Sequence, residues 1–289
     1  MSESVWGFGI VRSQELSGSR ALFDELCAAA TKATGVRMAP FTATSYRELA
    51  EALERGEVGF AWMPPVPSVE LEERRIASVL CVPSRHGSTS YHAALVVRRG
   101  GPKSLDELRG RRAAWVQRDS AAGYIVPRAH LAAQGFDVLR FFSREVFMHS
   151  HEAVVDAVAS GEVDVGATFC AVDDRGKLLR ASWMDADGQS ARPVETIATM
   201  GPIPNDALLA SMELPATTRA SMTRWLLDLD AAGRDIFRRL LDAAEFRLAP
   251  PGHYDALRHA LRAARARGYD SMPPPSRRLL VARPRKPGS

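Results

Sequence analysis

The first sixty residues alternate between short apolar runs and segments with helical spacing, and this alternation constrains the fold more than any other feature. An apolar run over 5–11 predicts a buried strand, and the apolar spacing that starts at Leu22 and ends at Gly35 predicts a helix. A strand over 36–41, a helix over 45–55 capped by Ser45 and a strand over 58–63 closed by Pro64-Pro65 continue the series. This order predicts a parallel sheet.

The same alternation returns after a break at Gly100-Gly101-Pro102, so a second α/β unit is expected to begin there and to end near 196–202. Two further strands, over 76–83 and 91–98, precede the break, and the chain is helical from Pro215 onward. We therefore expect an α/β fold of two lobes, each a mixed sheet flanked by helices, with a cleft between them and two hinge crossings. The expected division is 1–99 plus 200–270 for lobe 1, 100–199 for lobe 2 and 271–289 for a basic, mobile tail.

The charge pattern excludes several classes of partner. Lys and Arg outnumber Asp and Glu by only 38 to 34, and apart from the tail they are spread along the chain, so a nucleic-acid surface is not expected. The chain has no apolar stretch of roughly 20 residues, so membrane insertion is not expected. The apolar run after Met1 lacks a basic n-region, which predicts a cytoplasmic protein, although removal of a native signal peptide also explains this start.

The cysteines and histidines give no sign of a metal site. Cys27, Cys81 and Cys170 are far apart and embedded in apolar runs, which predicts buried thiols. His149 and His151 could form a metal pair, but no carboxylate or thiol partner is placed to complete a site. We expect neither a metal nor a cofactor.

The strongest functional signal lies over 112–124, where an apolar strand leads into a turn of small residues and directly into a helix. The first N–H groups of a helix have no internal partner and lie at the positive end of its dipole, so an oxyanion can bind there. Ser120 adds a hydroxyl, and Ala121, Ala122 and Gly123 let the ligand approach the backbone. A second element follows, in which His151 opens a helix that precedes the strand over 163–168.

These segments resemble the phosphate, phosphite and phosphonate substrate-binding proteins of ABC transporters, the PhnD-like group within the type 2 periplasmic-binding-protein fold. The resemblance covers roughly residues 5–255. It rests on six motifs in family order: Ser45–Leu49 with Gly56–Trp62, Ser90–Ala93, Ser104–Gly110, Asp119–Tyr124, His151-Glu152 with Gly161–Val165, and Gly201–Asp206.

The resemblance implies which residues contact the ligand. Ser120, the turn amides of Ala121 to Gly123 and His151 would hold the oxyanion, and Tyr46 and Tyr91 would wall the pocket. Tyr124, Trp62 and Asp206 complete the candidate set. Two departures point to a different or larger ligand: Ala121 and Ala122 replace hydroxyl residues of the family, and Val172 lies in the run where aminophosphonate binders place a carboxylate for the amine.

Each candidate also has a structural explanation. Ser120 is equally suited to cap its helix, and so is His151. Tyr46 follows a helix cap and fits plain packing, Trp62 at a strand end fits a core position, and Asp206 fits a hinge. The arginine-rich helix over 258–267 is most simply a solvated face.

The main functional hypothesis is a non-catalytic protein whose lobes close over a small anion such as a phosphonate, phosphate or phosphate ester. Its partners would be an ABC transporter permease or a regulatory protein. The first alternative is a cytosolic enzyme of the same fold acting on a small phosphorylated or carboxylated metabolite, although no nucleophile with an adjacent base is evident. The second is a regulatory module whose closure is sensed by another protein.

Overall fold

The computed structural model describes residues 5–11, 19–85, 87–173, 175–185, 187–266 and 279–281. The chain forms two compact units, and we call them unit 1 (Met1–Ser90 and Pro204–Tyr254) and unit 2 (Tyr91–Ile203 and Asp255–Ser289). The chain therefore passes between the units at three points. The strand over 91–98 and the helix after Tyr254 both belong to unit 2, whereas the sequence placed them in lobe 1. Of the expected tail over 271–289, only 279–281 is described, and these residues form a strand.

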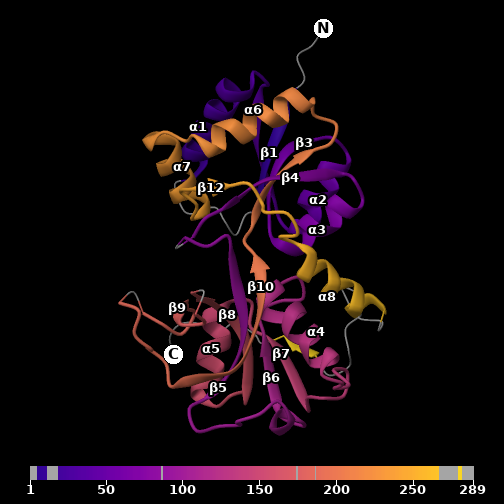
Figure 1. Cartoon of the computed structure of the whole chain (residues 1–289), viewed down its shortest axis with the longest axis vertical. Coiled ribbons are helices and arrows are strands. Elements are labelled where there is room, and N and C mark those ends of the chain that lie inside the picture. The colour runs from indigo at the N-terminus through magenta and orange to yellow at the C-terminus, as the bar shows by residue number, and fades with distance from the viewer. Residues whose placement is uncertain are drawn as a thin grey trace. The chain divides into compact units, whose positions relative to one another are not determined.

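Unit 1 contains a six-stranded mixed sheet in the order β12-β4-β11-β3-β1-β2. Figure 1 labels four of its strands, β1, β3, β4 and β12. β1 is parallel to β2 and β3, and β11 is antiparallel to β3 and β4. The carboxyl ends of β1 to β4 consequently share one edge of the sheet. The elements are β1 (Trp6–Val11), α1 (Ser19–Thr34), β2 (Met38–Ala43), α2 (Tyr46–Glu54), β3 (Val58–Met63), α3 (Pro65–Glu73), β4 (Ala77–Pro83), β11 (Ala207–Ser211), α6 (Ala216–Leu227), α7 (Ala231–Leu241) and β12 (Phe246–Arg247).

Alternation along β1 explains how helices cover both faces of this sheet. Phe8 and Ile10 belong to a buried cluster with residues of α1, α6 and α7. Gly9 points to the other face, where a Cβ would lie 2.3 Å from Leu49 Cδ1 of α2. Glycine at this position therefore lets α2 pack directly on the strand.

Three elements of unit 1 were not expected from the sequence: α3, β11 and the strand β12, which lies in the region from Pro215 onward that was expected to be helical. Pro64-Pro65 closes β3 as expected, but Pro65 also begins α3, because proline is well suited to the first helical position. β11 is a five-residue strand between β3 and β4, and its antiparallel direction makes the sheet mixed.

Unit 2 contains a seven-stranded sheet in the order β10-β5-β8-β6-β7-β13, with β9 paired to β8. β6, β7 and β8 run parallel, and β5 is antiparallel to β8. The elements are β5 (Ser90–Arg98), the 3-10 helix η2 (Asp106–Leu108), β6 (Arg112–Trp115), the π-helical turn η3 (Ala121–Ile125), α4 (Val126–Ala133), β7 (Arg144–Phe147), α5 (His151–Ser160), β8 (Val165–Val172), β9 (Leu178–Ala181), β10 (Val194–Pro204), α8 (Asp255–Ala266) and β13 (Leu279–Val281).

A buried ion pair stabilises unit 2 beside α4. Arg128 of α4 pairs with Glu145 of β7, and both side chains are about one-tenth exposed or less. The same carboxylate accepts a 2.7 Å hydrogen bond from Trp115 Nε1, and Arg128 also donates to the Val138 carbonyl. The charges are therefore paired and hydrogen-bonded, as burial requires.

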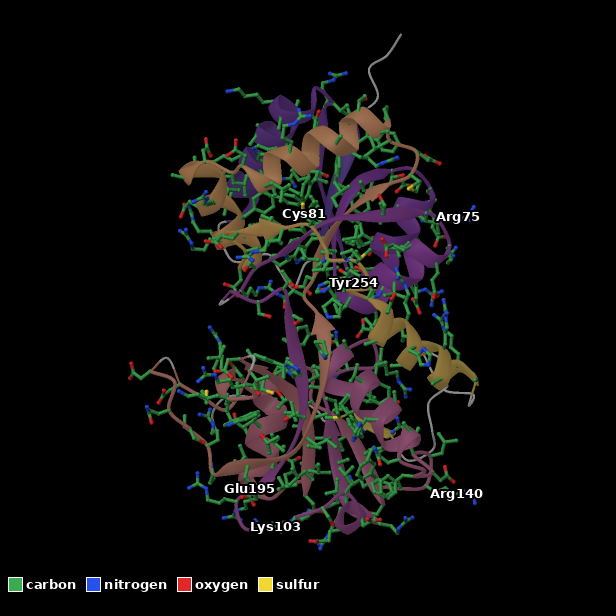
Figure 2. The ribbon with its side chains drawn as sticks, in the orientation of Figure 1. Arg75, Cys81, Lys103, Arg140, Glu195 and Tyr254 are labelled. Atoms are coloured by element: carbon green, nitrogen blue, oxygen red, sulfur yellow. The ribbon has the colours of Figure 1, made fainter. Side chains whose placement is uncertain are left out.

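The three cysteines are free and buried, as the sequence predicts. Burial raises the pKa of Cys27 and Cys81 to about 12 and that of Cys170 to about 11, so the thiols stay protonated at neutral pH. Cys81 lies inside unit 1, whereas the ion pair between Lys103 and Glu195 is at the surface of unit 2 (Figure 2). Among the described helices, none is both long and apolar enough to cross a membrane.

Candidate functional site

The carboxyl ends of β6, β7 and β8 bring the two anion-binding signals of the sequence to one edge of unit 2. η3 begins shortly after β6, and α5 begins shortly after β7. The N–H groups of Met148 and His149 donate to the carbonyls of Trp115 and Val116, which ties the two connections together. Both η3 and α5 contact β8. The Ser120 turn and His151 therefore flank the same strand.

The turn at Ser120 has the geometry of a helix N-cap. Ser120 Oγ accepts a 3.0 Å hydrogen bond from the N–H of Gly123, so the capping explanation is confirmed and one of the three proposed amides is already engaged. The N–H groups of Ala121 and Ala122 have no acceptor within the helix because they begin it. A serine hydroxyl that accepts one hydrogen bond still has a proton to donate.

Small side chains are required for this turn to pack. A Cβ on Gly123 would lie 2.4 Å from Val116 Cγ2 and 2.7 Å from Ser120 Oγ. Ala121 and Ala122 are 5% and 1% exposed. The backbone is thus fixed closely against the end of β6.

His151 is held by a row of hydroxyl groups that the sequence did not reveal. Its Nδ1 lies 3.0 Å from Thr168 Oγ1 of β8, and that hydroxyl lies 2.6 Å from Ser182 Oγ. The imidazole also packs perpendicular to the Phe169 ring, at 5.0 Å between ring centres. The helix cap of α5 is Ser150, not His151, because Ser150 Oγ accepts from the N–H of Ala153.

Burial shifts the pKa of two titratable side chains at the carboxyl edge of the unit 2 sheet. It lowers the pKa of His151 to about 4, so the imidazole is neutral at neutral pH and has one N–H to donate. Burial also raises the pKa of Asp119, the residue before Ser120. The Arg118 guanidinium lies 5.2 Å from the centre of the Phe147 ring and supplies a positive charge two residues before Ser120.

The other candidates of unit 2 differ in exposure. Tyr124 is 4% exposed and packs edge-on against Trp115, so it helps to form the core. Tyr91 is half-buried at the start of β5, and its neighbour His92 pairs with Cys170 of β8.

The remaining candidates belong to unit 1. Tyr46 is half-buried and opens α2 directly after its cap, Ser45. Trp62 is completely buried and packs edge-on against Phe246 in the core cluster, which fits the packing explanation. Asp206 is partly exposed directly before β11, at the carboxyl edge of the sheet.

Asp206 has a partner that the sequence did not identify. Arg85 Nη2 donates to Asp206 Oδ2 at 3.2 Å. Arg85 follows the end of β4, and the two residues are 121 positions apart in the chain. His149 is exposed, and within the described ranges no three histidine, cysteine or acidic side chains are grouped to hold a metal.

Comparison with known proteins gives one family match. Residues 8–254 match the family model described as an ABC transporter, phosphonate, periplasmic substrate-binding protein.

Solved structures show the same fold. The protein XAC2383 from Xanthomonas citri bound to ATP has 21% identity and a TM-score of 0.74, covering 92% of this chain and 99% of that one. PhnD1 from Prochlorococcus marinus in complex with methylphosphonate has 14% identity and a TM-score of 0.67, covering 93% and 100%. A binding protein component of an ABC phosphonate transporter from Pseudomonas aeruginosa has 19% identity and a TM-score of 0.65, covering 92% and 88%.

Proposed function

The chain belongs to the periplasmic substrate-binding proteins of phosphonate ABC transporters, and we propose that it binds a small phosphonate or phosphate-bearing ligand at the carboxyl edge of the unit 2 sheet. The fold is that of the type 2 periplasmic binding proteins. The family is described as periplasmic, so the expectation of a cytoplasmic protein has no support. Delivery to a transporter permease is the role we propose for the bound complex.

The observation that carries the proposal is the hydrogen-bonded row Ser182, Thr168 and His151 beside the Ser120 turn. We propose that Ser182 donates to Thr168 and that Thr168 donates to His151 Nδ1, an arrangement in which the imidazole carries its proton on Nε2. A neutral imidazole suits an oxyanion because its N–H can donate a hydrogen bond while the side chain itself carries no charge that would have to be buried. The amides of Ala121 and Ala122 and the hydroxyl of Ser120 would supply the other donors.

The two alanines of the turn, which replace hydroxyl residues of the family, affect which ligand the site can bind. Ala121 and Ala122 provide backbone donors only, so the site offers fewer side-chain donors than hydroxyl-bearing relatives. ATP and methylphosphonate, the ligands of two proteins with this fold, both carry phosphorus oxyanions. We therefore propose a phosphoryl group as the recognised element and closure of unit 1 over it, as hinge closure in this fold class suggests.

Calorimetric titration tests the proposal, with methylphosphonate, orthophosphate, ATP and sulfate against the wild-type chain. Ser120→Ala, His151→Gln and Thr168→Val should each weaken the best ligand about tenfold or more, because hydrogen bonds to charged groups contribute roughly 1.5 to 3 kcal/mol. Thr168→Val keeps the shape of the side chain and removes only the hydroxyl.

A matched control separates binding from capping. Asp230 caps α7 by accepting from the N–H of Gly233, the same arrangement as Ser120 and Gly123. Asp230→Ala should lower stability without changing the dissociation constant. Wild-type affinity in all three site variants would refute the assigned site.

A further inference from the structure

A pocket of about 460 Å³ opens in unit 2 between α4, β10 and α8, and we call it the α4–α8 pocket. The two helices lie side by side (Figure 1). α4 lines the pocket from Val126 to Ala133, α8 from Ala256 to Ala263, and β10 over 199–203. Five of the lining residues are alanines, whose short side chains leave the space between the helices open. Ligand pockets have volumes of roughly 300 to 1,000 Å³ and mainly apolar walls, so this space is suited to a small molecule.

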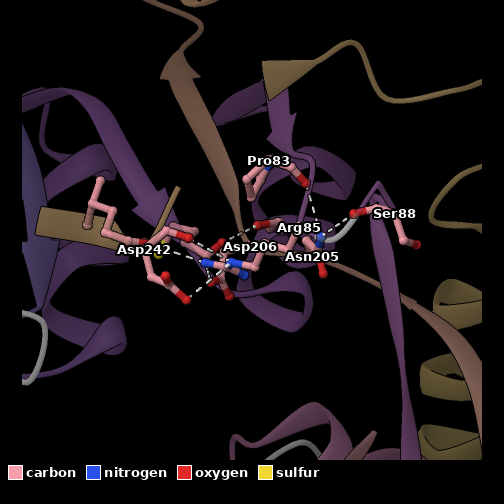
Figure 3. Close-up of polar contacts among 9 residues, drawn as sticks. Pro83, Arg85, Ser88, Asn205, Asp206 and Asp242 are labelled. Atoms are coloured by element: carbon pink, nitrogen blue, oxygen red, sulfur yellow. Dashed lines mark hydrogen bonds and ion pairs between the residues drawn. The ribbon is translucent and has the colours of Figure 1, made fainter. Parts of the chain in front are cut away.

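Three polar side chains also line the α4–α8 pocket. Among the described residues, the hydroxyl of Thr199 and the imidazoles of His130 and His259 take part in no hydrogen bond or ion pair. Burial lowers the pKa of His130, so its imidazole is neutral at neutral pH and can donate one hydrogen bond and accept another. Arg85 and Asp206, at the edge of the unit 1 sheet, are in contrast bonded to each other (Figure 3). The pocket therefore combines apolar walls with a few unpaired polar groups, as ligand sites do.

The β10 wall of the pocket lies at the same edge of the sheet as the oxyanion turn. The N–H of Arg99, directly after β5, donates to the carbonyl of Pro193, directly before β10. A Cβ on Gly201, near the end of β10, would lie 2.8 Å from the imidazole of His92, near the start of β5. The two strands are thus antiparallel. Because His92 pairs with the carboxyl half of β8, residues 199–203 lie at the carboxyl edge of the parallel strands.

The helix α4 connects the pocket to the oxyanion turn. α4 begins at Val126, directly after η3, and Val126 lines the α4–α8 pocket. Val126 follows Ala122 by four residues, which is about one helical turn or about 6 Å along the axis. The near end of the pocket is therefore within reach of an organic group whose phosphoryl group is bound at the amides of the turn.

We propose that the α4–α8 pocket holds the organic group of the ligand, and that the ligand is a phosphonate or phosphate ester of an aromatic group. The inference rests on the proposed function. An aromatic ring between the alanine methyl groups would remove apolar surface from water, and the imidazoles of His130 and His259 are suited to contact such a ring. The Thr199 hydroxyl is available to a polar substituent. Because Ala121 and Ala122 supply backbone donors only, contacts in the pocket would add to the affinity of the turn.

Calorimetric titration of methylphosphonate and phenylphosphonate tests the inference, since the two ligands share the phosphonate and differ in the organic group. The wild-type chain should bind phenylphosphonate about tenfold or more tightly than methylphosphonate, because the ring is buried. Ala129→Leu and Ala260→Leu fill the space between the helices and should each reduce this preference to about threefold or less. Ala266→Leu adds the same group at an exposed position of α8 outside the pocket and should leave the preference unchanged.

A second measurement uses the wild-type chain and does not depend on the folding of any variant. On saturation with phenylphosphonate, the methyl resonances of Ala129 and Ala260 should shift more than on saturation with methylphosphonate, because the ring current of a bound aromatic group acts at short range. The methyl resonance of Ala266 should shift equally little with both ligands.

The outcomes of these experiments are distinct. Equal affinity of the wild-type chain for the two phosphonates, a preference that survives both Ala129→Leu and Ala260→Leu, or equal methyl shifts with both ligands would overturn the inference while the proposed function stands. Failure of the wild-type chain to bind any phosphonate or phosphate would refute the proposed function, and the inference with it.

Discussion

The half-buried imidazole of His151 should make the protein lose stability as the pH falls. Burial lowers its pKa in the folded chain to about 4, from an ordinary value of 6.5. Between these two values the unfolded chain binds a proton that the folded chain does not, so stability decreases as pH falls from 6.5 toward 4 and is constant above 6.5. At 1.36 kcal/mol for each pH unit, His151 should cost about 2 kcal/mol at pH 5 and about 3 kcal/mol below pH 4.

Urea unfolding at pH 7.5 and pH 5 measures this effect when the wild-type chain is compared with His151→Gln. The glutamine cannot titrate, so the variant should lose about 2 kcal/mol less on acidification. Burial also lowers the pKa of His92, His130 and His253, and comparing the two chains cancels those contributions. An equal loss in both chains, or an imidazole of His151 that titrates near 6.5 by NMR, would refute the reasoning.

Two further predictions concern packing and charge in unit 2. Gly123→Ala places a methyl group against Val116 and should destabilise the protein by about 1 to 3 kcal/mol in urea unfolding. Calorimetry should also show weaker phosphonate binding. A variant with wild-type stability and affinity would contradict the close contact. Glu145→Gln leaves Arg128 as a buried cation and should cost about 3 to 5 kcal/mol in urea unfolding; a loss below about 1 kcal/mol would show that the pair is not buried in solution.

The sequence predicted the elements whose signals are local. Apolar alternation located β1 to β5, and Ser45 marks the start of α2 as expected. α3 was missed because Pro65, a strand breaker in one context, begins a helix in another. β11 was missed because a five-residue apolar run becomes a strand only through pairing with β3 and β4.

The candidate site likewise contains residues with a local sequence signal and residues whose role depends on distant contacts. The Ser120 turn and His151 could be proposed from the sequence because the signal of each lies in residues next to it in the chain. Thr168 and Ser182 could not, since their roles arise from contacts with His151 across 17 residues and with each other across 14. Arg85 gave no sequence signal, because its partner Asp206 comes near only when β4 and β11 pair.

The backbone amides of Ala121 and Ala122 test the central claim most directly. On addition of methylphosphonate to isotopically labelled protein, their amide proton resonances should move downfield and saturate with the dissociation constant measured by calorimetry. The amide of Gly123, which is held by Ser120, should move less. Saturable binding that leaves the amides of Ala121 and Ala122 unmoved would contradict the assignment of this turn as the oxyanion site.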